Sequence, residues 1–97
     1  MTNPTFLTEV DGAIETYEDA IGNFASRTRM MIDELGAVEA LSKLVQSPKL
    51  QTGFRVLRDR GELDKSFEAV VLRHSQLFKP PVVEAARWRI ERAEDLE

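Results

Sequence analysis

The sequence predicts an all-α protein, a small helical bundle of about five helices with a long amphipathic N-terminal helix. Three observations predict this class. Apolar residues recur every three or four positions along most of the 97 residues, and no stretch alternates apolar and polar residues for long enough to form a strand. Glycine and proline fall between the periodic stretches. At this length we expect a single helical domain over residues 1–97.

The first predicted helix is acidic and spans about residues 5–35, ahead of a compact short-helix region over 36–97. An unbroken helix of about 30 residues would measure roughly 45 Å, whereas a globule of this size is only about 32 Å across. The helix therefore either breaks near Gly22 or lies beside a second chain. Its apolar stripe is expected to form either the protein's own core or a dimer seam, and that seam would include Leu7, Val10, Ile14, Tyr17, Ile21 and Phe24.

The shorter helices are separated by turn residues. Ser47 and Pro48 predict the N-cap and first turn of a helix that reaches Arg60. Gly61 closes that helix, and Asp64 is expected to cap the next one. The expected buried positions in this region are Val38, Leu41, Val45, Leu50, Phe54, Leu57, Phe67, Val70, Val71, His74, Val83, Ala86, Ile90 and Ala93.

Charge is distributed unevenly along the chain. Residues 1–40 contain eight of the 17 acidic residues and only two bases. The net charge of −4 argues against a protein that binds nucleic acid through its overall charge. The acidic side chains that we expect to contact a basic partner are Glu9, Asp11, Glu15, Glu18 and Asp19.

No motif in the sequence predicts an enzyme. His74 is the only histidine, cysteine is absent, and there is no metal-binding helix motif, EF-hand loop or glycine-rich phosphate loop. We therefore expect no catalytic residue, no cofactor and no metal site. A basic-then-apolar leader and an apolar run of about 20 residues are also missing, which predicts a cytoplasmic protein without membrane contact.

Basic residues gather around the single tryptophan. Arg87 and Arg89 flank Trp88, which projects away from the apolar stripe of the last predicted helix. Trp88 is expected either to anchor a partner or to be covered by the first helix. An alternative function, a nucleic-acid-binding accessory protein, would use Arg55 and Arg58 of one helix together with Arg87, Arg89 and Arg92.

Part of the chain resembles a short helical module of uncharacterised bacterial and mobile-element proteins. The resemblance covers residues 34–92 and implies no activity. It implies structural roles for Gly53 and Gly61 in turns, Asp64 as a cap, and Phe54, Val70, Val71 and Phe78 in the core. The segments that carry it are Glu34-Leu-Gly-Ala-Val-Glu-Ala-Leu, Gly53-Phe-Arg-Val-Leu, Gly61-Glu-Leu-Asp-Lys-Ser-Phe-Glu-Ala-Val-Val-Leu, Leu77-Phe78 and Ala85-Ala86-Arg87.

These features together predict a non-enzymatic protein–protein interaction or regulatory protein, with a homodimer as one expected state. A sharper version is an inhibitor encoded by a phage or mobile element, anti-CRISPR-like or anti-restriction-like. Its acidic helix would occlude the basic channel of a nucleic-acid-handling host complex. The predicted partner-binding residues are Glu9, Asp11, Glu15, Glu18, Asp19, Arg87, Trp88 and Arg89.

Overall fold

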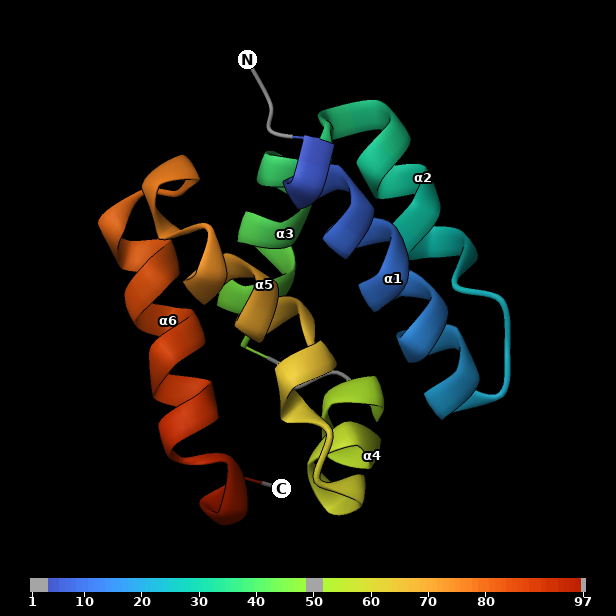
Figure 1. The fold of residues 1–97 in the computed structure, drawn as a ribbon, viewed down its shortest axis with the longest axis vertical. Coiled ribbons are helices and arrows are strands. Elements are labelled where there is room, and N and C mark those ends of the chain that lie inside the picture. The colour runs from blue at the N-terminus through green and yellow to red at the C-terminus, as the bar shows by residue number, and fades with distance from the viewer. Residues whose placement is uncertain (1–3, 49–51, 97) are drawn as a thin grey trace.

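A computed structural model describes residues 4–48 and 52–96, and every regular element within those ranges is helical. The prediction of an all-α bundle is confirmed, with six α-helices in the described ranges where about five were expected. The elements are α1 (Pro4–Ile21), α2 (Ser26–Leu35), α3 (Ala37–Gln46), α4 (Thr52–Arg60), η1 (Leu63–Lys65), α5 (Phe67–Arg73), η2 (Ser75–Leu77), α6 (Pro80–Glu91) and η3 (Ala93–Asp95). Figure 1 shows α5 in the middle of the bundle, with α6 on one side and α1 on the other.

Of the two expectations for residues 5–35, the structure shows the break near Gly22, where the chain divides into α1 and α2. Gly22 has a φ of +67°, the left-handed conformation that commonly ends a helix. The N–H groups of Gly22 and Asn23 donate to the carbonyls of Asp19 and Glu18, at 3.3 and 3.2 Å. The chain then turns back, so that α2 runs beside α1 (Figure 1). The remaining 18 residues of α1 measure about 27 Å and fit within the 35 Å longest dimension.

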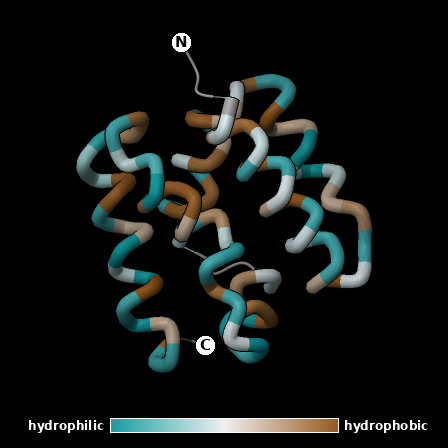
Figure 2. The backbone as a smooth tube through the Cα atoms, in the orientation of Figure 1, coloured by the Kyte–Doolittle hydropathy of each residue, from teal (hydrophilic) through white to brown (hydrophobic). Residues whose placement is uncertain are grey.

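The core lies where α1, α3, α5 and α6 meet. Figure 2 colours the backbone by hydropathy, and hydrophobic segments occur on each of these four helices. Burial of apolar area on this scale is the main force that holds the helices together. The largest fully buried side chains are Phe6, Leu41, Val45, Leu57, Val70 and Val71.

Two helix starts differ from the sequence prediction. Ser47 is the C-cap of α3 with an extended ψ of 136°, as a residue before proline prefers, and the described part of α4 begins at Thr52. Leu50, expected in the core, lies outside the described residues. Asp64 lies in η1, and the N-cap of α5 is Ser66, whose Oγ accepts the Ala69 N–H at 3.2 Å.

The buried face of α6 also differs from the predicted stripe. Val82, Ala86 and Arg89 are buried on this helix, whereas Val83 and Ile90 are only half-buried. Ala86 and Ala93 are buried as predicted, but Val82 and Arg89 take the places expected of Val83 and Ile90, so the buried face is turned by about 50°. An arginine can occupy a buried position only when its charge and its donors are satisfied, and the groups that satisfy Arg89 are described below.

Candidate interaction surface

The five predicted carboxylates of the first helix do not form one surface. Glu9 and Glu18 lie on the two flanks of α1 and are bound within the protein. Glu9 Oε1 accepts from Arg73 Nε at 2.6 Å, and Glu9 Oε2 lies 2.7 Å from His74 Nε2. These hydrogen bonds, Arg73 first and His74 second, lower the pKa of the Glu9 carboxyl. Glu9 therefore joins α1 to the end of α5.

Glu18 joins α1 to α2. Its Oε2 accepts from Arg29 Nε and from the Ala25 N–H, each at 2.8 Å, and its Oε1 accepts from Arg29 Nη2 at 2.8 Å. This is the two-pronged arginine–carboxylate geometry that fixes both partners. The hydrogen bonds from Arg29 and then from Ala25 lower the pKa of Glu18 to about 2. Glu18 is therefore a structural residue.

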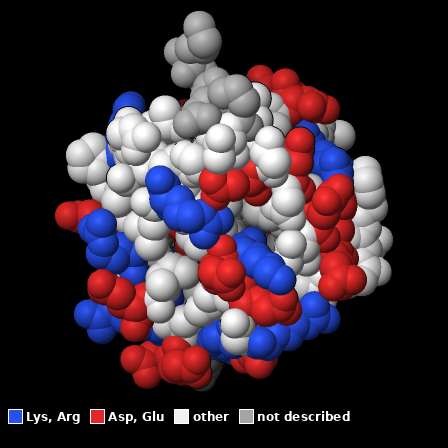
Figure 3. Space-filling model, in the orientation of Figure 1, with Lys and Arg blue, Asp and Glu red and all other residues white. Residues whose placement is uncertain are grey.

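The other three carboxylates form an exposed row on α1, which we call the acidic row (Asp11, Glu15 and Asp19). They are four residues apart, so they share one face of the helix at intervals of about 6 Å. All three are exposed, and Asp19 makes an open ion pair with Arg60 at 3.2 Å. Figure 3 shows carboxylates in a band along the side of the molecule where α1 and α2 lie.

The residues predicted as a dimer seam on the first helix mostly belong to the protein's own core. Val10 and Ile14 are buried, and Tyr17 and Ile21 are half-buried. Leu7 and Phe24 are exposed. A second copy therefore has no continuous apolar seam on α1 to bind.

The exposed apolar surface lies instead on the α1–α2 hairpin. Among the described residues, four of the five exposed large hydrophobic side chains belong to this hairpin; the fifth is Trp88. The four are Leu7 (46% exposed), Phe24 (63%), Met30 (59%) and Leu35 (43%). Met30 and Leu35 were not expected to be exposed, because residues 26–35 were predicted to lie on one helix with residues 5–25. The break at Gly22 is the signal that separates the two helices.

A groove of about 560 Å³ lies between the end of α1, α2 and the end of α3. Tyr17, Ile21 and Met31 contribute apolar side chains to its wall. The charged side chains among the described lining residues are Arg27 and Lys43, both cationic. The groove is open to solvent and adjoins the exposed ring of Phe24.

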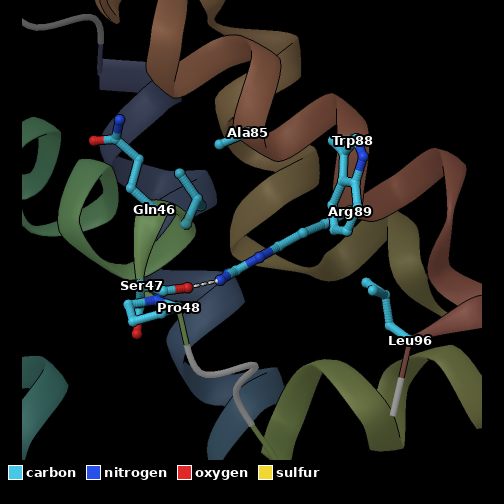
Figure 4. A pocket seen from close by; sticks show the side chains of 8 residues that line it. Gln46, Ser47, Pro48, Ala85, Trp88, Arg89 and Leu96 are labelled. Carbon is cyan, nitrogen blue, oxygen red and sulfur yellow. Dashed lines mark hydrogen bonds between the residues drawn. The ribbon is translucent and has the colours of Figure 1, made fainter.

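A second groove, of about 500 Å³, lies between α6 and the end of α3 (Figure 4). Arg89, predicted as a surface residue, extends across its floor and is only 6% exposed. Its guanidinium donates to Glu68 Oε2 at 2.9 Å, to the Leu44 carbonyl at 3.1 Å and to the Ser47 carbonyl. Burial raises the pKa of the Glu68 carboxyl, and the hydrogen bond from Arg89 opposes this rise. Arg89 is thus buried in the protein and does not face a partner.

Trp88 and Arg87 do reach the surface, and Trp88 lines the groove of Figure 4. Trp88 is 50% exposed, and the guanidinium of Arg92 lies 5.5 Å from the centre of its ring. Such an arrangement is a weak cation–π contact. Trp88 was expected either to anchor a partner or to be covered by the first helix. In the structure, half of its surface is open to solvent.

The basic residues of the nucleic-acid alternative do not form one basic face. Arg58 donates to the carbonyls of Ala93 and Leu96 and so ties α4 to the end of the chain. Arg55 is half-buried, and Arg89 is buried. Arg87 and Arg92, both on the C-terminal helical segment, are exposed.

Metal-binding side chains do not cluster in the part of the chain that the structure describes. Within residues 4–48 and 52–96, no group of three or more His, Asp or Glu side chains could hold a metal ion. His74, the only histidine of the sequence, is buried against the ring of Phe6, with ring centres 5.2 Å apart. In the part of the chain that the structure describes, no helix has the length and apolarity needed to cross a membrane.

Comparison with known proteins gives no relative. No protein-family model matches the chain, no curated protein is significantly similar in sequence, and no solved structure is significantly similar in fold.

Proposed function

We propose that this chain is a non-enzymatic interaction protein that presents the acidic row of α1 to a basic surface of a protein partner. The observation that carries the proposal is that Asp11 and Glu15 make no ion pair with another described residue, whereas four arginines are held by acceptors of the chain. Arg29, Arg58, Arg73 and Arg89 are bound by acceptors within the chain. Asp11 and Glu15 remain exposed on the outer face of α1.

The chemistry of the acidic row favours one kind of partner. A straight row of negative charges is complementary to a groove that binds a nucleic-acid backbone, since such grooves are lined by Lys and Arg. The charges of the acidic row are farther apart than those of a nucleic-acid strand, which carries one phosphate per roughly 3.4 Å. Leu7, exposed near the start of α1, adds an apolar contact beside the charges. The protein would therefore act by occluding a basic site, and an origin in a phage or mobile element stays a prediction.

The test compares two neutralised variants that keep the shape of the side chains. The first, Asp11→Asn with Glu15→Gln, removes two charges of the row that make no bridge to another helix. The matched control, Glu84→Gln with Glu91→Gln, removes the same charge from exposed positions on α6. Asp11 and Glu15 are used rather than Glu18, because neutralising Glu18 would also release α2.

Each tagged protein is used to capture partners from a lysate of the source organism, and each captured protein is tested for nucleic-acid binding. We expect the wild type and the α6 control to capture the same protein and to reduce its affinity for nucleic acid. The row variant should bind that protein roughly tenfold more weakly. Equal capture by the row variant, or unchanged nucleic-acid binding by the captured protein, would contradict the proposal.

A further inference from the structure

We propose that the outer face of α2 binds a second copy of this chain, with two α2 helices lying antiparallel across a two-fold axis. The residues of this face, which we call the α2 face, are Arg27, Met30, Met31 and Glu34. The inference goes beyond the function proposed above, which concerns the acidic row on α1 and requires no second copy.

Arg27, Met30 and Glu34 of the α2 face point away from the protein's own core, whereas Met31 packs against the core and, with Arg27, lines the groove between α1, α2 and α3. The single fully buried residue of α2 is Thr28. At about 100° per residue, the four residues of the face fall within an arc of about 100°. Arg27, Met30 and Glu34 are exposed, and Met31 is half-buried. Methionine is flexible and polarisable, and it adapts well to a partner surface.

The two charges of the face are Arg27 and Glu34, near the two ends of α2. Neither Arg27 nor Glu34 makes an ion pair with any of the described residues. They are two turns apart, beyond the three- or four-residue spacing at which side chains on one helix pair. Each also opposes the helix dipole, because Arg27 lies in the first turn and Glu34 in the last. A basic residue in the first turn and an acidic residue in the last turn destabilise the helix itself. A stabilising contact for these two charges must therefore come from outside α2.

An antiparallel second copy satisfies both charges at once. The order Arg27, Met30, Met31, Glu34 is symmetric about its centre, with the sign of the charge reversed. Two such helices, placed antiparallel, bring Arg27 opposite the partner's Glu34, and the two-fold axis repeats the pair on the other side. The four methionines meet between the two ion pairs. The antiparallel arrangement also places the positive end of each helix beside the negative end of the other.

The same arrangement covers Met30, one of the exposed large hydrophobic residues of the described chain. Leu35 lies about 90° around α2 from the centre of the α2 face and stays outside the paired surface. A helix of ten residues is about 15 Å long, so the interface is small, and we expect a weak dimer that forms at high concentration.

The test is the mass in solution, measured by sedimentation equilibrium from about 10 μM to about 1 mM. We expect the wild type to approach twice its 11.0 kDa as the concentration rises. Arg27→Glu and Glu34→Arg should each weaken the dimer roughly tenfold, because each reversal places like charges together at two symmetric sites. The double variant Arg27→Glu/Glu34→Arg should restore the dimer to within about threefold of the wild type, because the pairs form again with exchanged signs.

Two controls separate the specific pairing from a general effect of charge or folding. Asp33→Arg makes the same charge change as Glu34→Arg at the neighbouring exposed position and should leave the dimer unchanged. The double variant aligns its charges with the helix dipole, so its helical circular dichroism should at least equal that of the wild type. A monomer at every concentration would overturn the proposal. So would a dimer that resists the single reversals, or single reversals that the double variant fails to rescue.

Discussion

Individual residues explain how closely the helices of this bundle approach one another. A Cβ atom at Gly53 would overlap the ring of Tyr17, so α4 can lie against α1 only because residue 53 has no side chain. The sequence analysis placed Gly53 in a turn, whereas it lies inside α4. Glycine weakens a helix interior, and its presence there is explained by the close approach to Tyr17.

Gly53→Ala is expected to destabilise the protein by about 1–3 kcal/mol, since the added methyl group must displace the Tyr17 ring or separate α1 from α4. Gly12→Ala is the matched control, because nothing lies within 4 Å of its added Cβ. Gly12 lies in the exposed interior of α1, where alanine should stabilise the helix by about 0.5–1 kcal/mol. Urea unfolding of both variants checks this pair, and equal shifts of the two midpoints would contradict it.

At the scale of the elements, two ion pairs determine how the helices are joined. The buried pair of Glu68 and Arg89 links α5 to α6, and Arg89 also satisfies carbonyls at the end of α3. A buried ion pair of this kind is costly to break, because the remaining charge is left without a partner. Glu18 and Arg29 link α1 to α2 near the surface. α2 itself packs on α3 and places Met31 and Ile32 against the core, and this second link adds to that packing.

The link between α1 and α2 should weaken in acid. The folded pKa of Glu18, about 2, lies below its ordinary value of 4.5. The ionised carboxylate therefore stabilises the fold above about pH 4.5, and this contribution is lost as the pH falls towards 2. Glu18→Gln should lower the urea midpoint at pH 7, and its difference from the wild type should shrink by pH 3. Glu15→Gln removes an equal charge without a bridge and should change the midpoint little. A constant difference for Glu18→Gln between pH 7 and pH 3 would show that the ionised carboxylate does not hold α2.

On the scale of the whole molecule, several arginines are hydrogen-bonded to acceptors of the chain, whereas Asp11 and Glu15 of the acidic row are exposed and make no ion pair with another described residue. Four arginines are bound within the chain, and they include Arg58 and Arg89, which were candidates for contact with nucleic acid. The acidic row and the α2 face lie on the same hairpin but on different helices. The hairpin is therefore the most promising region for association, with a basic partner on α1 and a second copy on α2.

This distribution of charge predicts that the protein alone does not bind duplex DNA. Gel-shift measurements with a duplex of about 20 base pairs in about 50 mM salt should show no complex at protein concentrations up to about 10 μM, because too few phosphates are neutralised. Arg87 and Arg92 are the exposed bases of the alternative function and provide the control. Salt-dependent binding that is lost in Arg87→Ala and Arg92→Ala would favour the nucleic-acid-binding accessory function instead.

The sequence by itself determined the helical class, most of the buried positions of α3, α4 and α5, Val10 and Ile14 on α1, and Gly22 as the place where the first helix can break. These features are local, since the helical period relates residues only three and four positions apart. The tertiary structure alone decided which charges are structural. Glu9 and His74 are 65 residues apart in sequence, and Glu68 and Arg89 are 21 apart, so no local pattern reveals that they meet. The prediction for the buried face of α6 was wrong at Val83 and Ile90 for this reason. An arginine enters the core only when a carboxylate from another helix is already there.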